Sequence, residues 1–294
     1  MADWITGASG FLGQHLVKYF PVAMTTRPDL RQRGEVFEVV RRIKPQRVVH
    51  LAYPGSRGIA TSVEEPLSLA ADLLRIDTNV IEICAQEGVG KLLCLGSVCG
   101  YPEHTLQPTR ESELWDGYPE PVNAAYGCAK RMQWVLLQAA RQQYGLNGIH
   151  LILANLYGPG DRSGHVIPSL IRKIRTAQRE GGPVVVWGHP DVTRSFLYVE
   201  DAAEGIWRAM ERYNSPEPLN LCSTEEVTMV DLVTHLTGLL EYTGPVTFDT
   251  SKPTGHRRRR FSTDRLATAL EWLPTTPLAV GLAAMVDWAL TETV

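Results

Sequence analysis

A tyrosine and a lysine stand four residues apart in the segment Tyr126-Gly-Cys-Ala-Lys130. On a helix, positions i and i+4 share one face, so the phenol and the ammonium would lie one turn apart. A positive charge held beside a phenol lowers its pKa and makes it a proton donor or acceptor near neutral pH. The spacing alone fits a surface pair on an amphipathic helix better, so its interpretation depends on the rest of the chain.

Three glycines in Gly7-Ala-Ser-Gly-Phe-Leu-Gly13 follow the first expected strand and open the first expected helix. Glycine permits a tight turn and a close backbone approach, so amides at the start of the helix can face a pyrophosphate. In this position the pattern favours a dinucleotide site over a purely structural turn. The residues of the expected site are Gly7, Ser9, Gly10, Phe11, Leu12 and Gly13.

The end of the second expected strand indicates which dinucleotide is used. It reads Thr25-Thr26-Arg27-Pro28, without an acidic residue. NAD sites usually carry an acid there for the ribose hydroxyls, whereas an arginine accommodates the extra phosphate of NADP. Arg27 therefore predicts a preference for NADPH.

Size and composition are ordinary for a globular chain and argue against several function classes. The 294 residues allow one domain, or one with a smaller lobe. A net charge of −3 does not favour nucleic acid, and one run of four arginines at 257–260 does not change this. The five cysteines form no metal-like pair, and their odd number suits a reducing cytoplasm. We expect no signal peptide, no membrane span and no metal.

Short apolar runs alternate with longer helical patterns in the first half of the chain. The expected strands are 2–6, 22–26, 47–52, 91–96 and 149–155, and the expected helices are 11–20, 37–43, 69–86 and about 124–144. This order predicts an α/β fold with a Rossmann-like, doubly wound parallel sheet.

The second half of the chain has a different texture. We expect helices at 168–179 and 229–240 and strands at 184–187 and 246–248. The sequence thus predicts an NADP(H)-binding domain at 1–155 and a smaller, interleaved substrate-binding lobe at 156–294. About 196–215 is expected to return to the main sheet.

Taken in order, these motifs resemble the extended short-chain dehydrogenase/reductases. The resemblance rests on the glycine-rich turn, Val48-Val49-His50-Leu51-Ala52, Ser97 after a strand, and Tyr126-x-x-x-Lys130. Within that superfamily the chain most resembles the GDP-L-fucose synthases, which are 4-keto-6-deoxymannose 3,5-epimerase/4-reductases. The matching stretches are GSVCGYP at 96–102, AYGCAK at 125–130, NLYGP at 155–159, GHVIP at 164–168, VWG at 186–188 leading to Arg194, and 246–255.

The resemblance implies a hydride reaction at a ketone. Tyr126 would give a proton to the developing alkoxide, and Lys130 would favour the phenolate and hold the nicotinamide ribose. Ser97 would hydrogen-bond the carbonyl oxygen and orient it. Leu51 and Ala52 belong to the implied cofactor site.

The resemblance also implies epimerisation at Cys99 and His165. A ketone at sugar C4 acidifies the protons on C3 and C5, so a base on one face and an acid on the other can invert those carbons. The fucose synthases use a Cys and a His in the matching stretches, and a thiol acts as a base in its thiolate form. Either residue alone fits a small filler or a loop hydrogen-bonder; together they favour epimerase function.

Several polar and aromatic positions would bind the substrate by resemblance. Positive charge and amide donors suit the oxygens of a nucleotide diphosphate. Lys173 is open to a second interpretation, since its helix also carries Arg172 and Arg175 and could simply be solvated. The implied substrate residues are Asn155, Val166, Lys173, Trp187, Arg194 and Arg258.

Three departures from the family pattern bear on the substrate. Val98 and Gly100 flank Cys99, where the family commonly has a hydroxyl residue and a bulky one. The loop at 54–59 is one residue longer than the family's Gly-Gly-Ile loop, and Ser9 replaces a phosphate-binding arginine of some members. Since the first two alter the implied sugar pocket, sugar identity or the extent of epimerisation can differ.

The sequence predicts NADPH-dependent reduction of a nucleotide-linked 4-keto-6-deoxyhexose at C4, coupled to C3 and/or C5 epimerisation. One alternative is a 4-ketoreductase that does not epimerise and acts on a dTDP- or GDP-deoxysugar. Another is a nucleotide-sugar epimerase that retains its nicotinamide; a non-catalytic nucleotide sensor fits least. The nucleotide and the sugar configuration stay open. A cytoplasmic homodimer, paired through two long helices, is implied by resemblance, with no nucleic acid and no membrane as partners.

Overall fold

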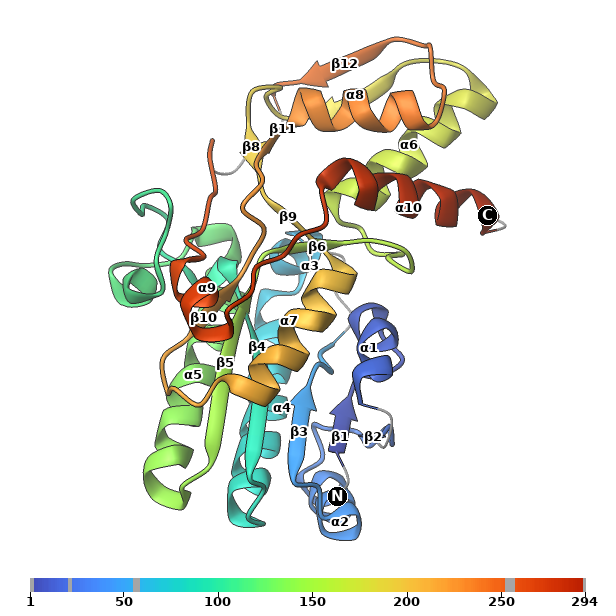
Figure 1. Cartoon of the computed structure of the whole chain (residues 1–294). Helices are drawn as coiled ribbons and strands as arrows, with labels where there is room; N and C mark the ends of the chain where they lie inside the picture. Colours follow the sequence, from blue (N-terminus) through green and yellow to red (C-terminus); the bar gives the residue numbers. More distant parts are fainter. Residues whose placement is uncertain (1–2, 21–22, 55–58, 252–256, 293–294) are drawn as a thin grey trace.

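The computed structural model describes residues 3–20, 23–54, 59–251 and 257–292 (Figure 1). The strands are β1 (Asp3–Thr6), β2 (Ala23–Met24), β3 (Arg47–His50), β4 (Lys91–Ser97), β5 (Asn147–Leu153), β6 (Asn155–Tyr157), β7 (Val184–Trp187), β8 (Thr193–Arg194), β9 (Phe196–Tyr198), β10 (Leu219–Leu221), β11 (Val227–Thr228) and β12 (Val246–Asp249). The helices are α1 (Phe11–Leu16), α2 (Arg33–Ile43), α3 (Ile59–Glu64), α4 (Pro66–Gln86), α5 (Ala124–Tyr144), α6 (Val166–Glu180), α7 (Val199–Arg212), α8 (Met229–Leu239), α9 (Asp264–Leu270) and α10 (Leu278–Thr291).

The main sheet has six parallel strands in the order β10-β5-β4-β3-β1-β2. From β1 the chain crosses to β2 on one side and then to β3 on the other. Strand order therefore reverses between β1 and β3. In open α/β sheets, ligands bind beyond the carboxyl ends of the strands at such a reversal. The expected doubly wound parallel sheet is confirmed.

Alternating side chains give this sheet two cores. Trp4, Val48 and Leu92 pack with α2, α4 and α5, whereas their neighbours Ile5 and Val49 pack with α1, α7 and α9. Successive strand side chains point to opposite faces, so adjacent apolar residues fill both layers. Figure 1 shows α7 crossing one face of the sheet while α4 and α5 lie toward the other.

A separate cluster forms the lobe at the top of Figure 1. Its buried side chains come from α6, α8 and α10, and from β7, which pairs with β12. Helix α10 was not expected from the sequence. It is apolar on most of its surface, so the helical period is weak. A usable signal was present: Pro277 precedes the helix, and Leu278, Leu282 and Met285 follow a helical spacing.

The chain does return from the lobe to the main sheet, by a route that the sequence did not specify. Strand β9 pairs with β6 outside the main sheet, and α7 then covers one face of it. The strand that joins the main sheet is β10, which lies parallel to β5 a few residues beyond 215. The division into two domains near residue 155 stays a prediction.

Candidate active site

The glycine-rich turn lies at the carboxyl end of β1. Gly7 has a φ of +71°, a left-handed conformation that favours glycine. A Cβ at Gly13 would lie 2.3 Å from the Gly7 carbonyl oxygen, and one at Gly7 would lie 2.8 Å from the Ala52 nitrogen. The turn thus packs backbone against backbone, and a side chain at Gly7 or Gly13 would force it apart. Ser9 and Gly10 are exposed at its outer edge.

Thr6, the last residue of β1 before this turn, is hydrogen-bonded to the segment that follows β3. Its Oγ1 accepts hydrogen bonds from the Leu51 and Ala52 nitrogens, each at 3.1 Å. It also lies 2.7 Å from Nδ1 of His50. The two strand ends that flank the reversal of strand order are therefore held together, as a dinucleotide site at this position requires.

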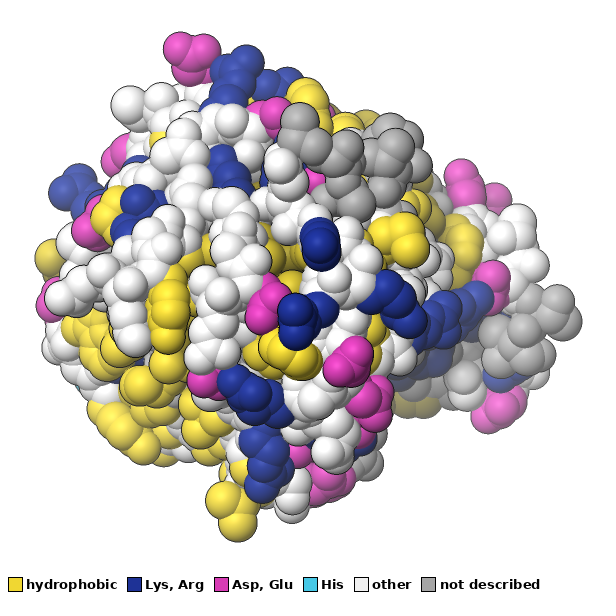
Figure 2. Space-filling view, turned by 90° about the horizontal axis from the view of Figure 1, so that it is seen from below, with side chains coloured by type: hydrophobic (Ala, Val, Ile, Leu, Met, Phe, Trp, Pro, Cys, Tyr) yellow, Lys and Arg dark blue, Asp and Glu magenta, His cyan; other side chains and the backbone are white. Residues whose placement is uncertain are grey.

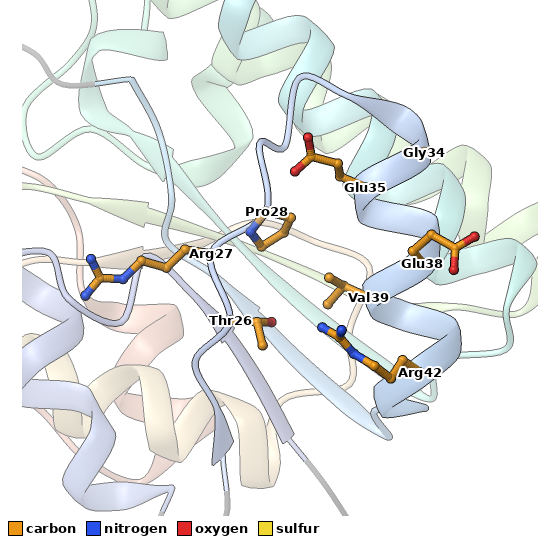
Figure 3. A pocket seen from close by; sticks show the side chains of 8 residues that line it. All are labelled: Thr26, Arg27, Pro28, Gly34, Glu35, Glu38, Val39 and Arg42. Carbon is orange, nitrogen blue, oxygen red and sulfur yellow. The ribbon is translucent and has the colours of Figure 1, made fainter.

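Arg27 is exposed and follows β2. It borders a hollow of ≈ 390 Å³ between this segment and α2. Figure 3 shows its side chain extending away from Glu35 and Glu38, on the other side of Pro28. The guanidinium is thus directed away from the two nearby carboxylates, which suits the proposed contact with an anionic ligand.

Ser97 ends β4 and begins the short 3₁₀ turn Val98–Gly100. Its Oγ accepts a hydrogen bond from the Cys99 nitrogen at 3.2 Å. Helix α5 packs closely on this turn, since a Cβ at Gly127 would lie 2.4 Å from the Cys99 carbonyl oxygen. Close packing here brings Tyr126, in the first turn of α5, to Ser97 and Cys99.

Tyr126 lies in the first turn of α5, which packs on the turn that follows Ser97. Burial raises the pKa of Tyr126 above its ordinary value, with a further rise from Cys99, and the nearby Ser97 hydroxyl only partly opposes this. The lowering of this pKa that we expected from Lys130 is therefore wrong. The reason is geometric, because the Lys130 ammonium is directed to other groups.

Lys130 is buried, with 3% of its surface exposed. Its Nζ donates to the Leu95 carbonyl oxygen at 2.9 Å and lies 3.1 Å from the centroid of the Tyr53 ring. Burial lowers the pKa of Lys130 to about 8, while the charge of Asp77 acts to raise it. The ammonium thus sits in the interior, one helical turn after Tyr126.

The two residues expected to epimerise the sugar lie in different parts of the fold. Cys99 is half-buried, and its effect on the Tyr126 pKa places it beside that phenol. His165 is exposed at the residue before α6, where its backbone nitrogen donates to Ser163 Oγ at 3.2 Å. No contact within the described residues joins His165 to Cys99 or Tyr126. Their action as a pair stays a prediction.

Two of the expected substrate residues, Lys173 and Trp187, line a second hollow, of ≈ 590 Å³. Lys173 donates to the Val185 carbonyl oxygen at 2.8 Å and lies 5.1 Å from the centroid of the Trp187 ring. Lys173 is thus held beside an aromatic face rather than left freely solvated. Asn155 and Val166 are exposed at the starts of β6 and α6, and their contact with substrate stays a prediction.

Arg258 is paired with an acidic side chain, and its expected contact with the substrate diphosphate stays a prediction. Its guanidinium pairs with Glu226 at 2.7 Å, and its side chain is 53% exposed. Residue 258 forms a parallel β-bridge with Thr193. The residues that follow these two, Arg259 and Arg194, therefore lie side by side. Because successive extended residues point to opposite sides, Arg258 and Arg259 diverge.

Arg259 is the arginine that approaches Arg194. Burial and the charge of Arg259 lower the pKa of Arg194 to about 10, while Glu120 acts to raise it. Arg259 is 21% exposed and donates to Glu120 at 3.0 Å. Sequence reasoning missed this residue. The bridge between residue 258 and Thr193 decides which arginine lies beside Arg194, and the sequence does not show that bridge.

Parts of two sequence features lie outside the described residues: 55–58 of the lengthened loop and 252–256 of the last matching stretch. The described part of the chain has no helix long and apolar enough to cross a bilayer. It also holds no group of three His, Cys, Asp or Glu that could bind a metal ion.

Comparisons by sequence and by structure match the chain to the same kind of protein. Residues 4–222 match the NAD dependent epimerase/dehydratase family. The chain is 36% identical over 292 residues to a GDP-L-fucose synthase of Sinorhizobium fredii (strain NBRC 101917 / NGR234), covering 95% of this chain and 92% of that one. It is 33% identical over 300 residues to the GDP-L-fucose synthase of Escherichia coli (strain K12), covering 92% and 93%.

Solved structures agree with this result. A crystal structure of a GDP-L-fucose synthetase from Naegleria fowleri matches with a TM-score of 0.90 and 28% identity, covering 98% of this chain and 93% of that one. A structure described as the same protein bound to NADP matches with a TM-score of 0.89.

Proposed function

The chain belongs to the NAD dependent epimerase/dehydratase family, and from this premise we propose that it reduces the C4 ketone of a nucleotide-linked 4-keto-6-deoxyhexose with NADPH. The observation that carries the proposal is the cluster at the carboxyl end of β4. There the turn that begins at Ser97 packs against the first turn of α5, which carries Tyr126, and Lys130 lies buried one helical turn further on. This cluster adjoins the reversal of strand order where the glycine-rich turn lies.

The residues of the glycine-rich turn fit a dinucleotide. Gly7 and Gly13 let the turn pack closely on its own backbone and on the Leu51–Ala52 backbone, a tight turn of the kind that precedes a pyrophosphate site. Arg27 offers a cation to the 2′-phosphate that distinguishes NADPH from NADH. When bound, NADPH supplies the hydride that adds to the ketone carbon.

Tyr126 and its neighbours handle the proton. Burial keeps the phenol protonated, so Tyr126 begins as a proton donor. Ser97 hydrogen-bonds the ketone oxygen and holds it near the phenol. As hydride adds to the carbon, the oxygen becomes an alkoxide and takes the Tyr126 proton. Lys130, one helical turn further on, would hold the nicotinamide ribose, as the resemblance to the family implies.

Arg194 and Arg259 provide charge for the substrate diphosphate. Both are shielded from bulk water, which strengthens their attraction for phosphate oxygens. Glu120 now pairs with Arg259, so a bound diphosphate would compete with that carboxylate. The Trp187 ring, with 64% of its surface exposed, offers a flat contact on the lobe.

Epimerisation would use Cys99 as the base that removes a proton from C3 or C5, and His165 as the acid that returns one to the opposite face. A second candidate is a 4-ketoreductase that does not epimerise; it is favoured by Val98 and Gly100, which flank Cys99 where the family commonly has a hydroxyl residue and a bulky one. Under either candidate Tyr126, Lys130 and Ser97 keep the same roles.

The stoichiometry of NADPH consumption tests the reductase activity. We expect one NADPH oxidised for each 4-keto-6-deoxy sugar consumed, and a higher kcat/KM with NADPH than with NADH. An Arg27→Ala variant should bind NADPH more weakly than the wild type does, and its affinity for NADH should be unchanged. Sugar turnover without net NADPH oxidation would identify an epimerase that retains its nicotinamide instead.

We also propose a homodimer formed through α4 and α5. These two helices pack side by side, and each has exposed residues at seven-residue spacing: Leu67 and Leu74 on α4, and Ala125, Met132 and Ala139 on α5. This spacing is typical of the contact seam of helix bundles. Figure 2 shows hydrophobic side chains gathered at the lower left of the face seen from below. Such patches are typical of protein interfaces.

A further inference from the structure

A cluster of buried polar side chains lies behind Tyr126 and Lys130. Its members come from β1, β3, the segment after β3, α4 and α5, and they connect the cofactor turn to the face of α5 that carries Lys130. They are Thr6, His50, Tyr53, Asp77 and Gln133. Asp77, His50 and Gln133 are each 0% exposed. Buried polar groups at this density need an explanation beyond packing.

The first link runs from the cofactor turn to Asp77. Thr6 Oγ1 accepts two backbone hydrogen bonds, from Leu51 and Ala52, so its own proton is given to Nδ1 of His50. His50 therefore carries its ring proton on Nε2. That nitrogen lies 3.4 Å from Oδ1 of Asp77. Burial lowers the pKa of His50, which keeps the ring neutral.

The second link runs from Asp77 to Lys130. Asp77 Oδ1 accepts from Gln133 Nε2 at 2.8 Å and from the Tyr53 hydroxyl at 3.2 Å. The same Tyr53 presents its ring to the Lys130 ammonium, 3.1 Å from the centroid. Burial opposes the ionisation of Asp77, but Lys130 and His50 outweigh it, and the pKa of Asp77 stays below its ordinary value.

The titratable groups that face Lys130 are Asp77, His50, Tyr53, Cys94 and His150. Burial raises the pKa of the Cys94 thiol and of the Tyr53 phenol, and lowers that of His150 to about 3, so all three are neutral near pH 7. Within the described residues, Asp77 is therefore the charged partner of Lys130.

Stability alone does not account for this pair. Burying an ammonium and a carboxylate is costly, and apolar residues of similar volume often serve a core equally well. The pair instead stands one helical turn from the residue proposed to donate the proton. At the other end of the polar cluster, Thr6 accepts hydrogen bonds from the amides of Leu51 and Ala52 and holds them beside the glycine-rich turn.

We propose that Asp77 is a positioning residue of the reaction: its carboxylate, oriented by His50, Tyr53 and Gln133, keeps Lys130 charged and in place one helical turn from Tyr126. The role in turnover rests on the proposed reductase function. The pairing of Asp77 with Lys130 is a property of the protein alone and can be measured without a substrate.

The first experiment titrates Lys130 by NMR in protein labelled with carbon-13 at the lysine side chains. The chain has six lysines, and a Lys130→Met variant assigns the signal. We expect Lys130 to titrate near pH 8 in the wild type. In Asp77→Asn it should titrate at least about one pH unit lower, because the nearby negative charge is gone. An unchanged titration would overturn the pairing.

The second experiment measures the pH profile of kcat/KM with a keto sugar that the wild type turns over. The ammonium is present below its pKa and lost as pH rises through it, so activity should fall on the alkaline side. In Asp77→Asn the alkaline fall of kcat/KM should move to lower pH, by as many pH units as the Lys130 pKa measured by NMR shifts. The matched control is Asp201→Asn, because Asp201 is also a buried acid and is hydrogen-bonded to Thr276. This control should leave the alkaline fall of kcat/KM at the same pH.

The outcomes separate this inference from the proposed function. A wild type that reduces no keto sugar rejects the function, and the NMR titration still decides the pairing. An NMR shift without movement of the alkaline fall overturns the positioning role. If Asp77→Asn does not fold, the Asp77→Asn/Lys130→Met double variant should fold, because no unpaired buried ammonium remains. A double variant that also fails to fold overturns the pairing.

Discussion

Tyr126 donates a proton in the proposed reaction, and its hydroxyl is the only atom that phenylalanine would remove. Tyr126→Phe should therefore lower kcat by about 10²–10⁴-fold, the usual contribution of a positioned acid. NADPH affinity should stay unchanged, since the ring still fills the site. Tyr118→Phe is the control, because Tyr118 is 66% exposed. Full activity in Tyr126→Phe would remove Tyr126 from the mechanism.

The two neighbouring arginines make a matched pair for the diphosphate site. Arg259→Ala should raise the Kd of a nucleoside diphosphate about 10–100-fold, which corresponds to the loss of a charge-assisted hydrogen bond of about 1.5–3 kcal/mol. Arg258→Ala should have little effect, since that side chain pairs with Glu226 at the surface. Calorimetric titration measures both. Equal losses in the two variants would contradict the assignment of Arg259.

The residues of the site were predictable where spacing along one element decides the outcome. Ser97, Tyr126 and Lys130 sit on the ends of β4 and α5, and the order of the elements brings them together. Arg259 was not predictable, because the choice between it and Arg258 depends on the bridge to Thr193. The raised pKa of Tyr126 depends on burial, which spacing does not reveal.

At the scale of elements, the turn between β1 and α1 has no room for a side chain. Gly13→Ala would place a Cβ 2.3 Å from the Gly7 carbonyl oxygen. Relieving this overlap by moving the backbone costs about 1–3 kcal/mol, so the Kd for NADPH should rise about 10–100-fold. Gly238→Ala in α8 is the control, since nothing lies within 4 Å of its Cβ. Unchanged NADPH affinity in Gly13→Ala would contradict the placement of the cofactor.

A helix or strand was predictable when its own sequence shows the hydrophobic period of that element. The strands of the first half are apolar runs bounded by turns, and four of its helices end at or near a glycine or before a proline. Strand β10 has only three residues and forms because β5 offers it a partner. No local pattern specifies such a pairing. Helix α7 lies within the segment 196–215 and covers one face of the main sheet.

At the scale of the whole molecule, the seam on α4 and α5 should hold two copies together. Met132→Lys would bury an unpaired charge there, at a cost of about 3–5 kcal/mol. The dimer should then dissociate at least about 100 times more readily. Leu290→Lys on α10, which is 54% exposed, is the control. Sedimentation or light scattering measures both variants. A wild type that is monomeric at micromolar concentration would contradict the proposed dimer.

The overall arrangement was predictable in outline only. The alternation of strands and helices predicts two covered faces, and the structure has them. The third core, in the lobe, brings together α6, α8 and α10, which begin at Val166, Met229 and Leu278 and are not consecutive in the sequence. Packing between such distant segments is decided by shape and burial rather than by local pattern. The sequence therefore indicated a lobe without its internal structure.

The most direct test of the central claim is product NMR after incubation with NADPH and GDP- or dTDP-linked 4-keto-6-deoxy sugars in deuterated water. We predict a sugar reduced at C4, with solvent deuterium at C3 or C5 if Cys99 and His165 act as proposed. Deuterium at neither carbon, with reduction intact, would leave a ketoreductase alone. Recovery of every keto sugar unreduced, from protein that binds NADPH, would contradict the account.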